Sequence, residues 1–339
     1  DEWRVKQDGD GGRRVDGAGS VGRVVDRNCE YSEQYYASTA SRLASLLPLL
    51  PPERRGLPLQ VMEYGLQENS LGVVDCDPGA WGGAWTLMSS VQVAQRGIER
   101  AYHWGFGDRN FANGRTICPR PLSRCGLYGG NMWVTAAAGH LFGNGSGSGT
   151  SAVVVLDAQN SSNASAHRGD DGGVSASGIG GWGAGRELRL LVSLFHPRKE
   201  LHAPVRLRII FDRPAEWDAK PKLLRRTMVL NSTTSVYDAV RAEAASVGTL
   251  RNASDHNVYT LKKMLTPAGL AAVQTAGERW LAQQRVSLTS SGWIAVAEAG
   301  EPGDEGNSDW RVSCDTAGKC SVTFVAMPPA VVASWLRPA

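Results

Sequence analysis

The chain has 339 residues, of which 36 are basic and 33 are acidic, so its formal net charge is +3. This length allows one large domain or two medium-sized domains, each with a substantial core. The basic residues are dispersed along the chain, which argues against nucleic acid as the main partner. No apolar run approaches the roughly 18 to 20 residues of a membrane helix. We therefore expect no transmembrane segment.

Residues 1–28 are rich in Gly, Arg and Asp and predict a loop. Within them, residues 17–22 read GAGSVG and match the G-x-G-x-x-G pattern of dinucleotide sites. That fingerprint needs a buried strand before it and a helix at its last glycines. Neither flank has the required pattern, so a loop is favoured over a nucleotide site. We expect no cofactor.

The segment that follows alternates between helical and strand patterns. Apolar residues recur at helical spacing over 32–50, before Pro51-Pro52. The run LPLQVM at 57–62 is short and apolar, which is typical of a buried strand, and Glu63 and Tyr64 follow it directly. The order helix, strand, helix, strand, helix continues with expected helices at 84–101 and 129–143 on either side of a strand at 102–108.

The composition of the sequence changes near residue 145. Residues 144–186 are rich in Gly, Ser and Asn, and we expect a mobile, glycosylated insertion with one strand at 152–157. Runs with strand alternation follow, and a β-sandwich accounts for them most simply. These expected strands cover 187–195, 205–211, 227–230, 292–297, 310–314 and 320–327, and one helix is expected at 266–284.

The cysteines and the Asn-x-Ser/Thr sequons both indicate an oxidising compartment. No Cys pair has C-x-x-C spacing and the His residues are scattered, so no metal site is predicted. Cys118 with Cys125 and Cys314 with Cys320 are close enough to form disulfides, which leaves Cys29 with Cys76. The candidate N-glycosylation sites are Asn144, Asn160, Asn163, Asn231 and Asn252. We expect a secreted or lysosome-like glycoprotein of the secretory pathway.

Glu63 stands where a strand ends, and aromatic residues stand close to the corresponding end of the next strand. Alternating strands and helices of this kind are typical of a (β/α) barrel, in which the C-terminal strand ends carry the active site. Aromatic rings stack on pyranose rings, and a carboxylate can attack or stabilise an oxocarbenium-like carbon. The pattern predicts a sugar site, although a solvated or structural role for Glu63 remains the alternative.

The blocks MEYG, AWTLMSSVQVAQRGIERAYHWGFGD and LYGGNMWVTAAAGHLFG, with the β-rich tail, resemble the C-terminal half of a retaining (β/α)8-barrel glycosidase. Glycoside hydrolase family 39, which includes β-xylosidases and α-L-iduronidase, is the most similar family. The resemblance implies a carbohydrate substrate, with Glu63 as the catalytic nucleophile of strand seven and Trp104 as a platform for the sugar.

Further substrate-binding candidates are Tyr64, His103, Trp81 and Trp85. For Trp81 and Trp85 the alternative is packing in the core or in a loop, and for His103 it is a hydrogen-bonded core histidine.

The predicted fold is therefore α/β plus all-β. Residues 1–145 are expected to form the C-terminal portion of a (β/α)8 TIM barrel, and residues 146–339 a β-sandwich accessory domain. A barrel has about 250 residues, but only 62 residues precede Glu63. In the family that the chain resembles, an Asn-Glu pair on strand four supplies the acid/base, and no such pair precedes Glu63.

We therefore expect an N-terminal barrel half, from the same precursor or from a longer protein, to supply the missing carboxyl group. The alternative function is a catalytically inactive glycosidase-like glycoprotein that binds glycans or serves as a structural subunit of a cell-surface or wall assembly.

Overall fold

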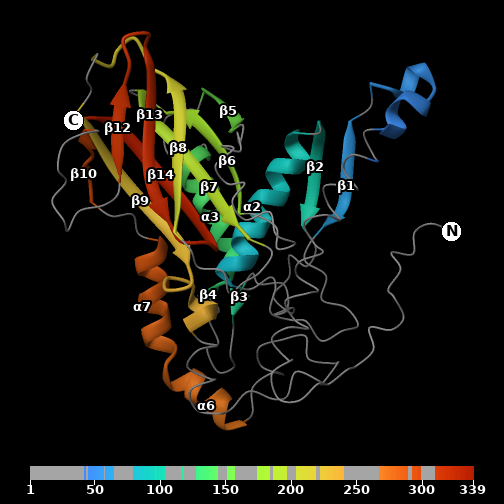
Figure 1. The fold of residues 1–339 in the computed structure, drawn as a ribbon. Coiled ribbons are helices and arrows are strands. Elements are labelled where there is room, and N and C mark those ends of the chain that lie inside the picture. Colours follow the sequence, from blue (N-terminus) through green and yellow to red (C-terminus); the bar gives the residue numbers. More distant parts are fainter. Residues whose placement is uncertain are drawn as a thin grey trace, which may run out of the picture.

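The structure is a computed structural model. It describes residues 42, 45–56, 58–64, 79–95, 97–103, 116–117, 127–143, 151–156, 174–183, 186–196, 204–218, 222–239, 267–288, 292–298 and 310–339. These residues build two packed β-sheets with two helices on the outer face of the larger sheet, and two further pairs of strands, β1 with β2 and β3 with β4 (Figure 1).

The larger sheet has the strand order β10-β9-β14-β7-β6-β5 and is antiparallel throughout. The smaller sheet has the order β11-β12-β13-β8, in which the pair β11 and β12 is parallel. The bounds are β5 (Ser151–Leu156), β6 (Ser175–Trp182), β7 (Leu188–Phe195), β8 (Val205–Asp212), β9 (Leu223–Asn231), β10 (Ile294–Ala295), β11 (Ala297–Glu298), β12 (Arg311–Cys314), β13 (Lys319–Ala326) and β14 (Ala330–Pro338).

One hydrophobic core lies between the two sheets. Leu190, Val332 and Leu336 of the larger sheet belong to it, together with Val322 and Phe324 of the smaller one. Strand β8 shows why the sheets face each other, because half-buried residues alternate with exposed ones along its whole length. The two-sheet arrangement predicted for the C-terminal part of the chain thus rests on a shared apolar core.

A second core lies on the outer face of the larger sheet, under the helices α2 (Ala80–Gln95) and α3 (Gly130–Phe142). Trp85, Met88 and Trp133 of the helices pack there with Phe195 and Val331 of the sheet. This core joins residues on both sides of the predicted boundary at 145/146, so the helices that the sequence assigned to the barrel are packed on the sandwich.

The two helices make their closest contact at glycines. A Cβ on Gly130 would lie 2.0 Å from the carbonyl oxygen of Gly79 and 2.7 Å from the amide nitrogen of Gly83. A Cβ on Gly83 would lie 2.5 Å from Cδ2 of Leu230 on β9 and 3.0 Å from the oxygen of Gly130. No side chain fits in this contact, so glycine is required where the helices begin.

The remaining elements are η1 (Leu47–Leu49), η2 (Pro52–Arg54), β1 (Leu59–Tyr64), β2 (Ile98–His103), β3 (Thr116–Ile117), β4 (Leu127–Tyr128), α6 (Pro267–Thr275) and α7 (Gly277–Leu288). Of the expected helix at 32–50, residues 42, 45 and 46 are described as α-helical, and η1 follows them. Among the described residues no helix is long and apolar enough to cross a membrane.

The boundaries expected around α2 were wrong. The helix begins at Ala80, before the expected loop has ended, and it stops at Gln95. Gly97 follows with φ of 71°, the left-handed conformation that ends helices. The chain then enters β2, so Ile98 to Ala101 are in a strand although they fit the helical spacing.

The expectation for 144–186 was wrong in part, because β6 is a full strand within the larger sheet. Its sequence SASGIGGW is rich in glycine, which is uncommon in strands. The glycines allow close packing, since a Cβ on Gly178 would lie 2.8 Å from the oxygen of Leu191. The expected strand at 152–157 is present as β5, and residues 144–150, 157–173 and 184–185 of the expected insertion lie outside the described residues.

Three further expectations in the C-terminal part needed correction. Strand β14 was not predicted, although it pairs with both β7 and β9 at the centre of the larger sheet. The expected helix at 266–284 is two helices, which meet at the buried Ala276. The expected strand at 292–297 changes sheets at the buried Val296, with β10 in the larger sheet and β11 in the smaller one.

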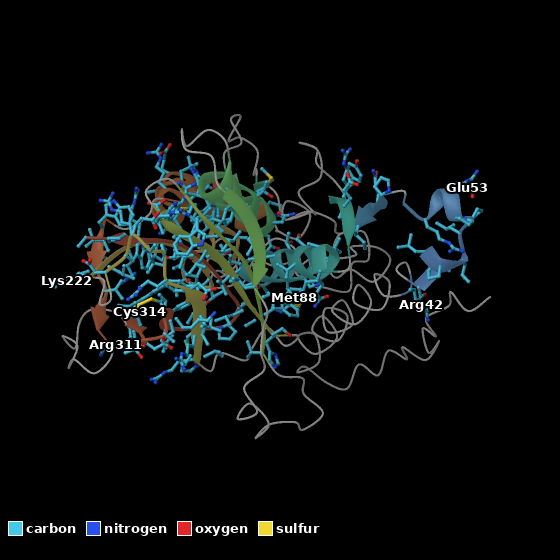
Figure 2. The ribbon with its side chains drawn as sticks, turned by 90° about the horizontal axis from the view of Figure 1, so that it is seen from above. Arg42, Glu53, Met88, Lys222, Arg311 and Cys314 are labelled. Carbon is cyan, nitrogen blue, oxygen red and sulfur yellow. A yellow bond between two sulfur atoms is a disulfide. The ribbon has the colours of Figure 1, made fainter. Side chains whose placement is uncertain are left out.

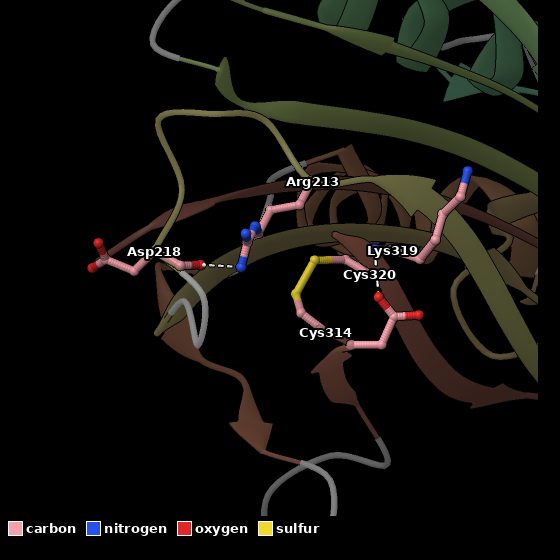
Figure 3. The surroundings of a disulfide bond; sticks show 6 residues. Arg213, Asp218, Cys314, Lys319 and Cys320 are labelled. Atoms are coloured by element: carbon pink, nitrogen blue, oxygen red, sulfur yellow. Dashed lines mark hydrogen bonds between the residues drawn. A yellow bond between two sulfur atoms is a disulfide. The ribbon is translucent and has the colours of Figure 1, made fainter. Parts of the chain in front are cut away.

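The disulfide between Cys314 and Cys320 confirms one predicted pair (Figure 3). The two residues are register partners on β12 and β13, and the turn between them contains Gly318 with φ of 84°. Asp315 Oδ1 accepts a hydrogen bond from the amide of Lys319 in the same turn, at 2.8 Å. Cys29, Cys76, Cys118 and Cys125 lie outside the described residues.

We expect Gly130→Ala to destabilise the fold by about 1–3 kcal/mol, because the added methyl group overpacks the start of α3 against Gly79. The measurement is the free energy of unfolding in urea. Gly139→Ala is the matched control in the same helix, since nothing lies within 4 Å of its added Cβ. That variant should gain about 0.5–1 kcal/mol, and equal effects of the two variants would contradict the contact.

Candidate active site

The candidate site lies where the parallel strands β1 and β2 end. The strands pair with each other, with Val61 opposite Ala101 and Tyr64 opposite His103, and α2 lies between them in the chain. Figure 1 shows the two strands side by side, with α2 between them and the larger sheet. A parallel pair connected by a helix is a β-α-β unit, and the order predicted from the sequence is therefore present.

The predicted nucleophile and two of its predicted neighbours share one end of this pair. Glu63 is the second-last residue of β1, and the register places Tyr64 next to His103 at the carboxyl ends of both strands. Their backbones are described and their side chains are not. Trp104 lies outside the described residues, so its predicted role as a platform stays a prediction.

Trp81 and Trp85 lie in the core under α2 rather than beside these strand ends. Trp85 is fully buried. Trp81 donates a hydrogen bond from Nε1 to the carbonyl oxygen of His196 at 2.7 Å, and its ring contacts Phe195 with 4.9 Å between centroids. Their placement favours packing, the alternative that the sequence left open, over contact with a sugar.

Asp238 holds the start of α2 and was missed by the sequence analysis. Its Oδ2 accepts a hydrogen bond from the amide of Ala80 at 2.9 Å, so a carboxylate meets the positive end of the helix dipole. Asp238 and Ala80 are 158 positions apart in the chain. Because the cap is distant in sequence, no local capping pattern could have identified it.

A second hydrogen bond ties α2 to the larger sheet. Ser193 of β7 donates from Oγ to the carbonyl oxygen of Ala84 at 2.6 Å, and both groups are buried. The start of the helix is thus attached at Ala80 and at Ala84, and the strand ends of β1 and β2 are placed relative to the sandwich through this helix.

Two described residues have shifted pKa values, and both are in the sandwich. A backbone hydrogen bond, with a further one from Arg186, lowers the pKa of the exposed Glu216 carboxyl. Burial lowers the pKa of Arg225, whose guanidinium stacks on Trp310. The described residues contain no group of His, Cys, Asp and Glu side chains that could hold a metal ion.

Among the predicted glycosylation sites, Asn231 lies within the described residues, whereas Asn144, Asn160, Asn163 and Asn252 lie outside them. Asn231 ends β9, and its Oδ1 accepts hydrogen bonds from the amide and the hydroxyl of Thr233, at 3.0 and 2.7 Å. The amide and hydroxyl of Thr234 donate to the same oxygen. The sequon therefore forms an Asx turn with Thr233 exposed.

No family model and no curated protein sequence matches the chain. The solved structures that are similar to it include two whose names give the family that the sequence resembles or one of its members. One is the GH39 enzyme of Xanthomonas axonopodis pv. citri, at 10% identity and a TM-score of 0.45, where the match covers 90% of this chain and 49% of that one.

The other is a bacterial orthologue of human α-L-iduronidase, at 10% identity and a TM-score of 0.37, where the match covers 87% of this chain and 44% of that one. The chain thus spans about half the length of each.

We expect Asp238→Ala to destabilise the fold by about 0.5–2 kcal/mol, because the amide of Ala80 loses its cap. Asp238→Asn should recover most of this loss, since asparagine caps helices about as well as aspartate. Unfolding in urea measures both variants. If Asp238→Asn were as unstable as Asp238→Ala, the side-chain oxygen would not be acting as a cap.

Proposed function

We propose that the chain is the C-terminal part of a retaining glycoside hydrolase in which Glu63 is the nucleophile. The observation that carries the proposal is the placement of Glu63, Tyr64 and His103 at the carboxyl ends of two parallel strands connected by a helix. In barrels built from such units the carboxyl ends of the strands form the active site.

The proposed chemistry needs two carboxyl groups about 5 to 5.5 Å apart. Glu63 attacks the anomeric carbon and forms a glycosyl-enzyme while the other group protonates the leaving oxygen. The second group then takes a proton from water, which attacks the same carbon and releases Glu63. Glu63 supplies the first group only, so an acid/base residue from outside this chain completes the pair.

The exposed apolar residues near β1 and β2 support a partner that continues this sheet. Parallel strands are normally buried on both faces and paired at their edges. Here Tyr102 of β2 is 43% exposed, and Leu46 and Leu49, at the two ends of η1, are 51% and 77% exposed. We propose that the N-terminal barrel half of the same precursor covers this region and supplies the acid/base.

For the whole protein with its N-terminal half, we expect Glu63→Gln to lower kcat by about 10⁴-fold or more, the scale seen when a covalent nucleophile is removed. Glu99→Gln on β2 is the control, because Glu99 is exposed on the neighbouring strand. A fluorosugar that traps the glycosyl-enzyme should label the peptide that contains Glu63.

Label on another residue, with Glu63→Gln fully active, would end the assignment. The alternative is a catalytically inactive glycoprotein that binds glycans or has a structural role. It requires the N-terminal half to lack a carboxyl group at the strand-four position, and hydrolysis by the whole protein would rule it out.

We also propose that the protein passes through the secretory pathway and carries a glycan on Asn231. The disulfide and the sequon, in which Ser232 and Thr233 are exposed, support this location. In the secreted wild-type protein, the peptide around Asn231 should carry an extra mass that N-glycosidase removes. Thr233→Ala and Asn231→Gln should both abolish this extra mass. Ser232→Ala, which keeps the sequon, should retain it. An unmodified Asn231 in the secreted wild-type protein would contradict the proposal.

A further inference from the structure

Four of the described strands stand at the edges of the two sheets, and among these β8 is both long and regular. Strands β10 and β11, at one edge of each sheet, have two residues each. Strand β5, at the other edge of the larger sheet, has six residues and an irregular register between Ser151 and Val154. Strand β8 has eight residues, and all of them pair in unbroken register with β13.

The free side of β8 lacks the features that usually keep an edge strand from pairing with another chain. Such features are short length, bulges, prolines and charged residues that point inward. The sequence VRLRIIFD contains no proline, and its charged residues all lie at exposed positions. No other described helix or strand runs along this side of β8, which lies next to β13 in Figure 1.

Four residues of β8 point to the outer face of the smaller sheet: Arg206, Arg208, Ile210 and Asp212. Ile210 is 59% exposed, although it is a large apolar residue. Asp212 forms an ion pair with Lys319 of β13. In the part of the chain that the structure describes, Arg206 and Arg208 form no ion pair. The outer face of β8 therefore carries two arginines and an isoleucine that the described residues leave uncovered.

A second copy of β8 fits this edge because the strand is complementary to itself. When two copies pair antiparallel with their inner faces on the same side, residues directly opposite each other both face inward or both face outward. A pair centred on Ile209 meets this condition over residues 206–212. It places Arg206 opposite Asp212 of the second copy, and two-fold symmetry makes this ion pair occur twice.

Other registers are less favourable. A pair centred on Arg208 sets this arginine against the same arginine of the second copy, and like charges directly opposite are destabilising. A pair centred on Ile210 shortens the paired segment to residues 208–212. In the register centred on Ile209, Arg208 lies opposite Ile210 of the second copy, so the aliphatic part of the arginine covers the exposed isoleucine.

The inner face of β8 also continues across this contact. Leu207, Ile209 and Phe211 are half-buried and pack against the core between the two sheets. In the register centred on Ile209, Leu207 lies opposite Phe211 of the second copy. We propose that two copies of the chain associate through β8 into a dimer with one continuous sheet of eight strands, four from each copy.

The proposed dimer contact is distant from the strand pair that carries Glu63. In Figure 2, Arg311 and Cys314 of β12, in the smaller sheet, lie at the opposite end of the molecule from Glu53, which precedes β1. Pairing through the smaller sheet leaves β1 and β2 accessible to an N-terminal half. The dimer does not depend on the proposed function, and it holds whether or not Glu63 is catalytic.

The test is sedimentation equilibrium of the whole protein up to about 100 µM, which covers the weak end of the range for protein interfaces. The wild-type protein should show a monomer–dimer equilibrium. Arg206→Glu and Asp212→Arg should each raise the dimer Kd by about tenfold or more, because each sets like charges opposite each other twice. Ile210→Lys should also weaken the dimer, since the new charge lies opposite Arg208 of the second copy.

An equimolar mixture of Arg206→Glu with Asp212→Arg should recover the dimer. In the mixed dimer one ion pair is the wild-type pair and the other is its reversal, so no like charges remain opposite each other. Recovery also shows that both variants are folded. The matched control is Arg285→Glu, the same charge reversal at an exposed position of α7, and it should leave the dimer Kd unchanged.

Three results would each overturn the proposal. The first is a wild-type protein that stays monomeric over the whole concentration range. The second is a dimer that the β8 variants weaken no more than Arg285→Glu does. The third is a mixture of Arg206→Glu and Asp212→Arg that is no more dimeric than either variant alone.

Discussion

The arrangement of the chain depends on the contact between the first turns of α2 and α3. Gly79, Gly83 and Gly130 allow the two backbones to approach so closely that no Cβ fits between them. Asp238 caps α2 at the same place. Because α2 connects β1 with β2, this contact fixes where the end of the strand pair, and with it Glu63, lies relative to the sandwich.

Much of the sandwich could be predicted because its strands carry period-2 patterns. The alternation along β8 is read directly from VRLRIIFD. Strand β14 was missed because it is buried on both faces and its sequence AVVASWLRP does not alternate. Strand β6 was missed because its glycines serve close packing, which has no local signal. The cap of α2 by Asp238 joins residues far apart in the chain, so only the folded structure reveals it.

For the candidate site, the sequence predicted the order strand, helix, strand and the position of Glu63 near a strand end. It did not separate aromatic residues that pack from those that could bind. Trp81 and Trp85 are residues of the type that stacks on sugars, yet they fill the core between α2 and the larger sheet. Whether a side chain of α2 is buried depends on which face of the helix meets the sheet. Because α2 is apolar on nearly all sides, its sequence does not specify that face.

The central claim concerns the strand pair that carries Glu63. If β1 and β2 are the last strands of a barrel, the amides of residues 59–64 should exchange with deuterium quickly in this chain alone. They should become strongly protected when the N-terminal half is present, because that half supplies the missing neighbouring strand. Amide hydrogen exchange of both forms is the most direct measurement. Equal protection of residues 59–64 with and without the N-terminal half would contradict the barrel and the shared active site.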